Sequence, residues 1–394
     1  MIVLFGLYVF ATPYFSDRNF YNYLVYILFA IFAVVVLLYR FLYFPKKINV
    51  RIFAMPLFAV FAIIGTTLFS HEYRYLLTVF LLAASYVIIY FLLEQADNTD
   101  LILRVTVYSL SAFTLLFAFH YRESIFDFSN FGSGRLAADN YFGNVNSVAY
   151  YFAACCILSL YLSLFGHRKI RFLFLIPFVF CFFIGTLTAS RAFLVGTVFA
   201  SISIFVIRLW NKPRVLIVCL VLLAIVTVAL FFLPAFAFMK KRLIDMFNTI
   251  LGNGRSVDYS TSTRLLWQDY ATYLGTHHLL FGNGLNGFAI YSGVGTYSHA
   301  NITETLCNTG IIGLLIYYSV FFIAVYDVTN KKMKYAPLVI TFLVFLVCRE
   351  FLSVSYTSKF NAFVFALIMH CGSLGSYKQR RKHISVNDYY VLEI

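Results

Sequence analysis

The sequence has little charge. Only 12% of its 394 residues are charged and 62% are hydrophobic, whereas a soluble domain usually carries about 25% charged residues. So few charges cannot cover the exterior of a water-soluble fold of this length. A soluble enzyme, a nucleic-acid-binding protein and a disordered chain are therefore excluded. The composition predicts a polytopic membrane protein that contacts the lipid bilayer.

Metal-binding and disulfide patterns are also missing. The seven cysteines fall in or beside apolar runs, without a CxxC pair or a His/Cys cluster. The predicted outer loops carry no closely paired carboxylates of the kind that bind divalent cations. We therefore expect no disulfide framework, no metal and no cofactor.

Long apolar runs make up most of the chain. A hydrocarbon core about 30 Å thick is crossed by a helix of about 20 apolar residues. By this measure we predict an all-α protein with about twelve transmembrane helices, at residues 1–15, 21–43, 52–69, 75–93, 101–120, 147–166, 172–188, 192–209, 215–235, 306–327, 335–356 and 360–375.

The spans divide the chain into four parts. Nine spans with short loops fill residues 1–235, and three more fill residues 306–376. Between them, residues 236–305 form a polar segment of about 70 residues, which is too long for a simple connection. We expect this segment to be an extracytoplasmic loop subdomain with short amphipathic helices. Residues 377–394 form a basic tail.

The net charge of +14 is distributed unevenly. Short loops with an excess of Lys and Arg lie on the cytoplasmic side of a membrane. The basic loops alternate correctly for one side, which places both termini in the cytoplasm. They contain Arg40, Lys46, Lys47, Arg51, Arg168, Lys169, Arg171, Arg208, Lys212, Arg214, Lys331, Lys332, Lys334, Lys378, Arg380, Arg381 and Lys382.

Two arginines lie at predicted outer turns. Arg191 lies between two apolar helices, and Arg264 follows Ser260–Thr263, a stretch of hydroxyl side chains that predicts a helix N-terminus. Each arginine either extends to the polar interface, as side chains near helix ends do, or binds an anionic group such as a phosphate. The residues alone leave both interpretations open.

Other polar residues near the predicted outer face also have two interpretations. His299 precedes an apolar span, and it is either structural or a general base, since a neutral imidazole accepts a proton near pH 7. The Gly-Asn-Gly turn at 282–284 is a flexible turn or a ligand contact, but it lacks the context of a phosphate loop. Adjacent Arg349 and Glu350 favour a structural ion-pair network over a substrate contact.

Five short motifs occur in a fixed order. They are Gly143-Asn144-Val145-Asn146 with Ala149, Ala189-Ser190-Arg191, Arg264 before Leu266-Trp267, Gly282-Asn283-Gly284 with Phe288, and His299 with Gly310-Ile311-Ile312-Gly313. Over about residues 135–320 the chain resembles the O-antigen ligase and polysaccharide polymerase family of the bacterial envelope. The family often has Asn directly after the histidine, whereas here Ala300 follows and Asn301 comes next. This spacing is similar to that of many capsular and exopolysaccharide polymerases.

The resemblance implies a glycan polymerase in the bacterial cytoplasmic membrane. Such an enzyme transfers oligosaccharide units from polyprenyl diphosphate to an acceptor sugar hydroxyl at the outer face, with inversion and without a metal. His299 would be the general base, and Arg191 and Arg264 would stabilise the leaving diphosphate. The other residues implied in substrate binding are Gly282, Gly284, Asn301, Asn144 and Asn146. A flippase and a chain-length regulator are candidate partners, in addition to the lipid-linked donor and the glycan or lipid-linked acceptor.

Two alternatives remain open. An O-antigen ligase would use the same residues but would transfer finished polymer to lipid A core or to another acceptor. A glycolipid flippase or other transporter fits the number of spans, although the halves of the sequence lack the repeat symmetry of most such folds.

Overall fold

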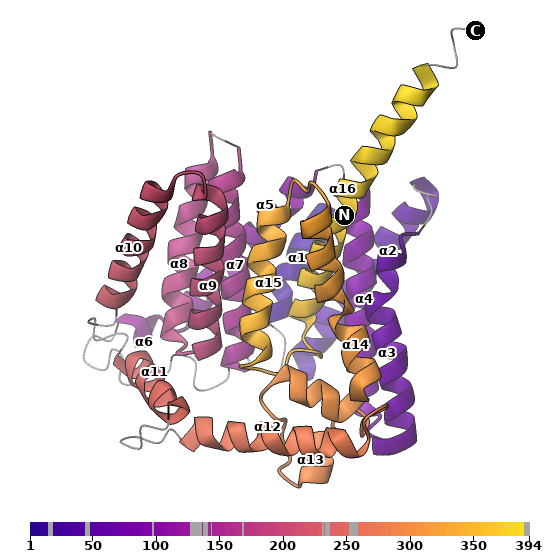
Figure 1. The fold of residues 1–394 in the computed structure, drawn as a ribbon, viewed down its shortest axis with the longest axis vertical. Coiled ribbons are helices and arrows are strands. Elements are labelled where there is room, and N and C mark those ends of the chain that lie inside the picture. Colours follow the sequence, from indigo (N-terminus) through magenta and orange to yellow (C-terminus); the bar gives the residue numbers. More distant parts are fainter. Residues whose placement is uncertain are drawn as a thin grey trace.

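The protein is all-α in the part of the chain that its computed structural model describes, which comprises residues 1–14, 19–43, 48–96, 98–126, 136, 141–142, 144–167, 169–230, 232, 237–251 and 259–389. Most of the helices run side by side in one bundle (Figure 1). Gly143 of the first motif and the basic residues Lys46, Lys47 and Arg168 lie outside the described residues.

The helices of the first part are α1 (Ile2–Tyr14), α2 (Asn19–Tyr43), α3 (Ala54–Gly65), α4 (Arg74–Gln95), α5 (Thr99–His120), α6 (Arg122–Phe126), α7 (Val145–Phe165), α8 (Leu175–Leu187), α9 (Arg191–Leu209) and α10 (Pro213–Leu230). Short turns of helix flank some of them, namely η1 (Val50–Phe53), η2 (Thr66–Ser70) and η3 (Arg171–Phe174). The remaining helices are α11 (Ala237–Ile250), α12 (Tyr259–His277), α13 (Gly287–Ser292), α14 (Asn301–Asn330), α15 (Ala336–Glu350) and α16 (Lys359–Tyr389).

Seven helical segments in the described residues are long and apolar enough to cross a membrane, and the protein is a multi-pass membrane protein. They are Val25–Tyr43, Val50–Ser70, Tyr75–Gln95, Thr99–His120, Val145–Phe165, Arg191–Leu209 and Asn301–Asn330. Four of the other predicted spans overlap shorter apolar helices, at Ile2–Pro13, Arg171–Leu187, Pro213–Leu222 and Lys359–Leu374. The remaining one is α15, which has 15 residues. The total of twelve spans stays a prediction.

The two ends of the bundle differ. Helix α12 lies across one end, where α11 and α13 are also found (Figure 1). We call this the loop end and the opposite one the far end. The N-terminus lies toward the far end, and the last turns of α16 extend beyond it (Figure 1). Helix α7 is the most enclosed of the seven candidate spans, with 83% of its apolar window buried, because it is apolar on all sides and packs against α5, α8 and α9.

A glycine bends α14 at the loop end. Gly310 has a left-handed backbone with φ of 65°, and a Cβ there would collide with the backbone of Leu280 and Phe281. Only glycine combines this φ with such a close approach. The bend separates the first turns of α14, which pack against α12, from its long membrane segment. It thereby brings the residues just before Asn301 to the loop end.

Candidate active site

A cavity of about 270 Å³ opens at the loop end of the bundle. Residues from six segments meet around it, and most of them come from helix ends. It is lined by Asn146, Tyr150, Arg191, Ala192, Arg242, Met246, Thr261, Arg264, Leu265, Gln268, His299, Phe351 and Leu352. The described lining therefore includes three arginines and one histidine but no carboxylate. This arrangement makes the cavity suitable for an anion.

Arg191 is the first residue of α9 and is held by a tight turn. Ser190 is the N-cap, and its hydroxyl accepts a hydrogen bond from the backbone N–H of Phe193 at 3.4 Å. Ala189 before it has a φ of 52°, which is unusual for a residue with a side chain. The Arg191 side chain is 7% exposed, and its Nη1 donates to Thr261 Oγ1 at 2.8 Å. Both the turn and the hydroxyl thus fix this guanidinium beside the cavity.

Helix α12 supplies one wall of the cavity. Thr261, Arg264, Leu265 and Gln268 all line it. Their spacing of three and four residues places them on the same helical face. Helix α12 begins at Tyr259, close to the helix start that the sequence predicts before Arg264. The helix therefore directs Arg264 and its neighbours toward the end of the bundle.

Helix α11 adds an arginine that the sequence analysis did not identify. Arg242 lines the cavity, and its Nη1 donates to the backbone oxygen of Ala189 at 2.7 Å. The same contact connects α11 to the turn before Arg191. In the sequence Arg242 follows Lys240 and Lys241, and such a basic run is typical of a solvent-exposed helical face. No pattern in the sequence separates it from its neighbours.

His299 lies in a strained and enclosed position. Its φ is 68°, in the left-handed region that residues with side chains seldom occupy. The Trp267 ring stacks on the imidazole with centroids 5.5 Å apart, and the Tyr297 ring contacts it edge-on at 4.5 Å. On one flank, the backbone N–H of Ser298 donates to Glu304 Oε2 at 2.6 Å. These contacts hold the histidine in place against the cavity.

The environment of His299 favours its neutral form. Burial and, to a smaller extent, the positive charge of Arg264 together lower its pKa to about 4. An uncharged imidazole is the form that accepts a proton. Beside it, burial raises the pKa of Tyr297, which also forms a hydrogen bond with the Asn144 side chain.

The start of α7 forms another wall. Asn144 caps the helix, since its side-chain oxygen accepts a hydrogen bond from the backbone N–H of Asn146 at 2.9 Å. Asn146 and Tyr150 both line the cavity, one helical turn apart. The structure thus brings Asn146 together with Arg191, Arg264 and His299, whereas Asn144 acts on the cap and on Tyr297. Sequence reasoning missed Tyr150, because nothing distinguishes it among 30 tyrosines.

The two glycines predicted to bind substrate lie in a packing contact. Gly282 has a φ of 69°, and a Cβ there would lie 2.5 Å from the backbone of Asn308. Gly284 has a φ of 80°, and a Cβ there would lie 2.6 Å from the hydroxyl oxygen of Ser70. The turn between them packs on α14, where Asn283 Nδ2 donates to the Cys307 carbonyl at 2.9 Å. Neither glycine is among the residues that line the cavity, and their role in substrate binding stays a prediction.

The Asn301 side chain also forms hydrogen bonds within the fold. It is fully buried, and its Oδ1 accepts hydrogen bonds from the backbone N–H groups of Ser355 and Tyr356 at 2.7 and 2.8 Å. Its Nδ2 donates to Glu350 and to the Tyr318 hydroxyl. The residue therefore joins the start of α14 to the segment after α15, directly behind His299.

Arg349 and Glu350 have different partners, as expected for adjacent helical residues. The Arg349 guanidinium donates to Asn361 and lies over the Tyr150 ring, 4.0 Å from its centroid. Glu350 accepts hydrogen bonds from Asn301, Ser355 and Tyr318. Among the described residues this pair forms hydrogen bonds and ring contacts, in place of the ion-pair network that the sequence favours.

The arrangement defines a class of protein. It is an all-α, multi-pass membrane protein with a cationic cavity at one end and a neutral histidine at the cavity wall. Residues 176–318 match the model of the O-antigen ligase family. This match includes Arg191, Arg242, Arg264 and His299, whereas Asn146, Tyr150, Phe351 and Leu352 complete the cavity from outside it. No curated protein matches the chain.

Proposed function

We propose that the protein is a glycan polymerase that uses a polyprenyl-diphosphate-linked donor. The observation that carries this proposal is the cavity in which three arginines surround a space next to a neutral histidine. A lipid diphosphate is multiply charged, and arginine binds phosphate oxygens through two parallel hydrogen bonds. The family domain supports a lipid-linked glycan as the substrate.

In this proposal the transfer is a single displacement. The acceptor hydroxyl oxygen attacks the anomeric carbon of the donor, and the bond between that carbon and the diphosphate oxygen breaks with inversion. His299 takes the proton of the attacking hydroxyl. Arg191 and Arg264 stabilise the negative charge that develops on the departing lipid diphosphate. Because the guanidinium groups supply the positive charge that stabilises this diphosphate, the step proceeds without a metal ion.

We further propose that the loop end faces the outside of the cytoplasmic membrane. Basic residues in short loops mark the cytoplasmic side, and Arg51, Lys331 and Lys334 all belong to the far end of the bundle. A donor delivered to the outer leaflet would then reach the cavity with its diphosphate at the level of the headgroups. Both termini would lie in the cytoplasm.

The proposal is tested by replacing each of Arg191, Arg264 and His299 by Ala in cells that depend on the protein for a surface glycan. We expect long polymer to disappear in each case, as measured by gel separation of the glycan, while the protein remains in the membrane. Matched controls are His277→Ala, at the exposed end of α12, and Arg122→Ala, an exposed arginine of α6. Normal polymer length in the three site variants would contradict the proposal.

Polymerase and ligase differ in the acceptor. The family description is that of a ligase, so the assay needs two acceptors. Purified protein in vesicles receives a lipid-linked donor with either the same lipid-linked oligosaccharide or lipid A core as acceptor. A ladder of longer lipid-linked glycans supports the polymerase, and transfer to lipid A core alone supports the ligase.

A further inference from the structure

The Tyr150 hydroxyl is a buried polar group without a partner. Tyr150 lies in the second turn of α7, is 2% exposed and lines the cationic cavity. Its hydroxyl has no hydrogen-bond partner among the described residues. Buried hydroxyl groups are nearly always hydrogen-bonded, because leaving one unsatisfied costs free energy. A group of this kind at the wall of a cavity is expected to gain its partner from a ligand.

The ring of Tyr150 cannot easily turn toward another partner. The Arg349 guanidinium lies over it, 4.0 Å from its centroid, and this arginine is itself 2% exposed and hydrogen-bonded to Asn361. The rings of Phe345 and Phe360 lie 6.3 and 6.4 Å from it, centroid to centroid. The cation and the two rings therefore fix the phenol ring of this cavity-lining residue.

We propose that the Tyr150 hydroxyl donates a hydrogen bond to a phosphate oxygen of the lipid diphosphate. This inference rests on the proposed function. Arg191 and Arg264 line the same cavity as Tyr150, so phosphate groups bound by these arginines would lie in the cavity that Tyr150 also lines. Hydrogen bonds to a charged oxygen are about twice as strong as those between neutral groups. A phosphate oxygen thus satisfies the hydroxyl better than a sugar hydroxyl would.

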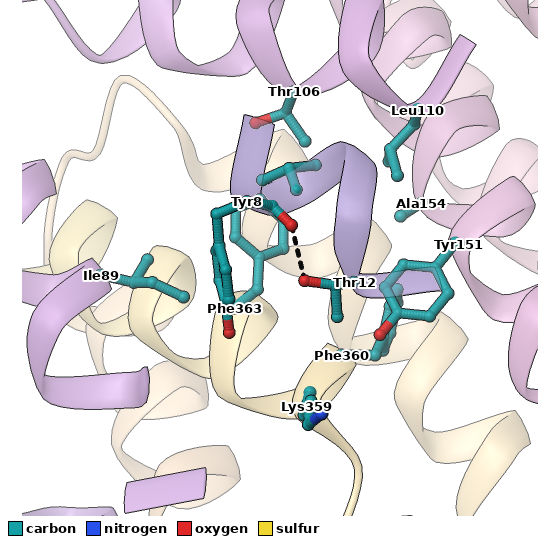
Figure 2. Close-up of a pocket in the computed structure, with 11 residues that line it drawn as sticks. Tyr8, Thr12, Ile89, Thr106, Leu110, Tyr151, Ala154, Lys359, Phe360 and Phe363 are labelled. Atoms are coloured by element: carbon teal, nitrogen blue, oxygen red, sulfur yellow. Dashed lines mark hydrogen bonds between the residues drawn. The ribbon is translucent and has the colours of Figure 1, made fainter. Parts of the chain in front are cut away.

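The next residue provides a matched control. Tyr151 lies on the same helix, but it lines a second cavity with Thr12, Leu110 and Phe360 (Figure 2). The Tyr151 and Phe360 rings meet edge-on, with centroids 5.7 Å apart. Removing the hydroxyl from Tyr151 is the same chemical change, one position along the chain, at a cavity that none of the three arginines lines.

The test measures direct binding of radiolabelled polyprenyl diphosphate, with polyprenol as the phosphate-free probe, to the full-length protein in detergent micelles. We expect Tyr150→Phe to weaken polyprenyl diphosphate binding by about tenfold, which corresponds to one charge-assisted hydrogen bond. Polyprenol binding is expected to stay unchanged. Tyr151→Phe is expected to leave both affinities at the wild-type value, and unfolding in denaturing detergent checks that both variants fold.

Two results would overturn this inference. One is an unchanged affinity of Tyr150→Phe for polyprenyl diphosphate. The other is an equal loss for polyprenol, which would assign Tyr150 to packing. A wild-type protein that binds polyprenyl diphosphate no better than polyprenol would instead contradict the proposed function, and with it the basis of this inference.

Discussion

The cationic side chains at the two ends of the bundle have different partners. At the far end they pair with carboxylates: Arg51 and Lys331 both contact Asp327, Arg40 lies 3.0 Å from Glu94, and Lys334 lies 2.9 Å from Asp100. At the loop end, Arg191 donates to a hydroxyl and Arg242 to a carbonyl, and both line a cavity. The comparison indicates that far-end charges hold helices together through ion pairs, whereas the loop-end arginines line the cavity in which we propose that an anionic ligand binds.

We expect the largest effect on the rate of glycan transfer from a substitution that keeps the positive charge of Arg191 but removes its planar guanidinium group. Arg191→Lys retains a cation but loses the planar fork that binds two phosphate oxygens. We expect the rate of glycan transfer to fall by about 10² to 10³-fold, as for loss of one preorganised donor. The measurement is transfer by purified protein in vesicles at saturating donor. Arg208→Lys in the last turn of α9, near the far end, is the control and should keep the wild-type rate.

Full activity of Arg191→Lys would contradict this expectation. It would mean that a point charge suffices at the loop end, so that the position of the guanidinium beside Thr261 does not contribute to the reaction.

At the far end we expect a loss of stability without a loss of activity. Asp327 is 1% exposed and contacts both Arg51 and Lys331. Asp327→Asn would leave two partly buried cations without their carboxylate, which costs about 3–5 kcal/mol in comparable buried pairs. The measurement is the free energy of unfolding in denaturing detergent, with transfer activity of the folded fraction as the second readout.

The control for Asp327 is Glu123→Gln, because Glu123 forms an exposed contact with Arg122. Exposed ion pairs contribute little, so this variant should unfold like the wild type. If Asp327→Asn instead kept its stability and lost activity, the distinction between the two ends would be wrong.

The pH dependence of transfer is the next largest effect. His299 acts as a base only when neutral, and its pKa is lowered from 6.5 to about 4 by burial and by Arg264. Transfer should therefore stay constant from neutral pH down to about pH 5 and decline as the pH falls through 4. At pH 5 about 90% of the imidazole is neutral, against about 3% for a histidine with an ordinary pKa.

The sign of this effect is checked with the pH dependence of the residual transfer by Arg264→Gln. Removing the positive charge takes away one of the two causes, so the acid midpoint should move upward, toward 6.5, while burial keeps it below that value. An acid midpoint near 6.5 in the wild type would show that His299 is not the base or is not enclosed during transfer.

Much of the fold was predictable because its apolar runs are long. The spans at residues 75–93 and 101–120 coincide closely with α4 and α5. Short helices were harder, since α15 has 15 residues and ends on the buried pair Arg349 and Glu350. A hydropathy pattern identifies which residues are apolar, but it does not determine whether a helix reaches across a membrane.

The site was predicted only in part. Arg191, Arg264 and His299 occur in recognisable motifs, and the structure places all three at one cavity. Arg242 and Tyr150 occur in unremarkable stretches of helix, and only the packing of α11 and α7 brings them there. Asn301, which the family resemblance implies in substrate binding, is not among the residues that line the cavity, and its role stays a prediction. Asn301 is two residues from His299 but faces Glu350 and the segment after α15.

The smallest expected effect is a difference in stability between two Gly→Ala variants at the loop end, which tests whether Gly282 serves packing or substrate binding. Gly282 and Gly293 have nearly the same φ, 69° and 70°, but a Cβ at Gly282 would press on the backbone of α14, whereas Gly293 has open space. Both substitutions place alanine at a similar positive φ, so the difference between their unfolding free energies reports mainly packing. We expect Gly282→Ala to lose about 1–3 kcal/mol more unfolding free energy than Gly293→Ala.

If the two variants are equally stable and Gly282→Ala instead raises the KM for the donor, Gly282 belongs to the substrate site, as the sequence resemblance implies. That outcome would extend the ligand-binding surface beyond the arginine cavity and toward the turn at 282–284.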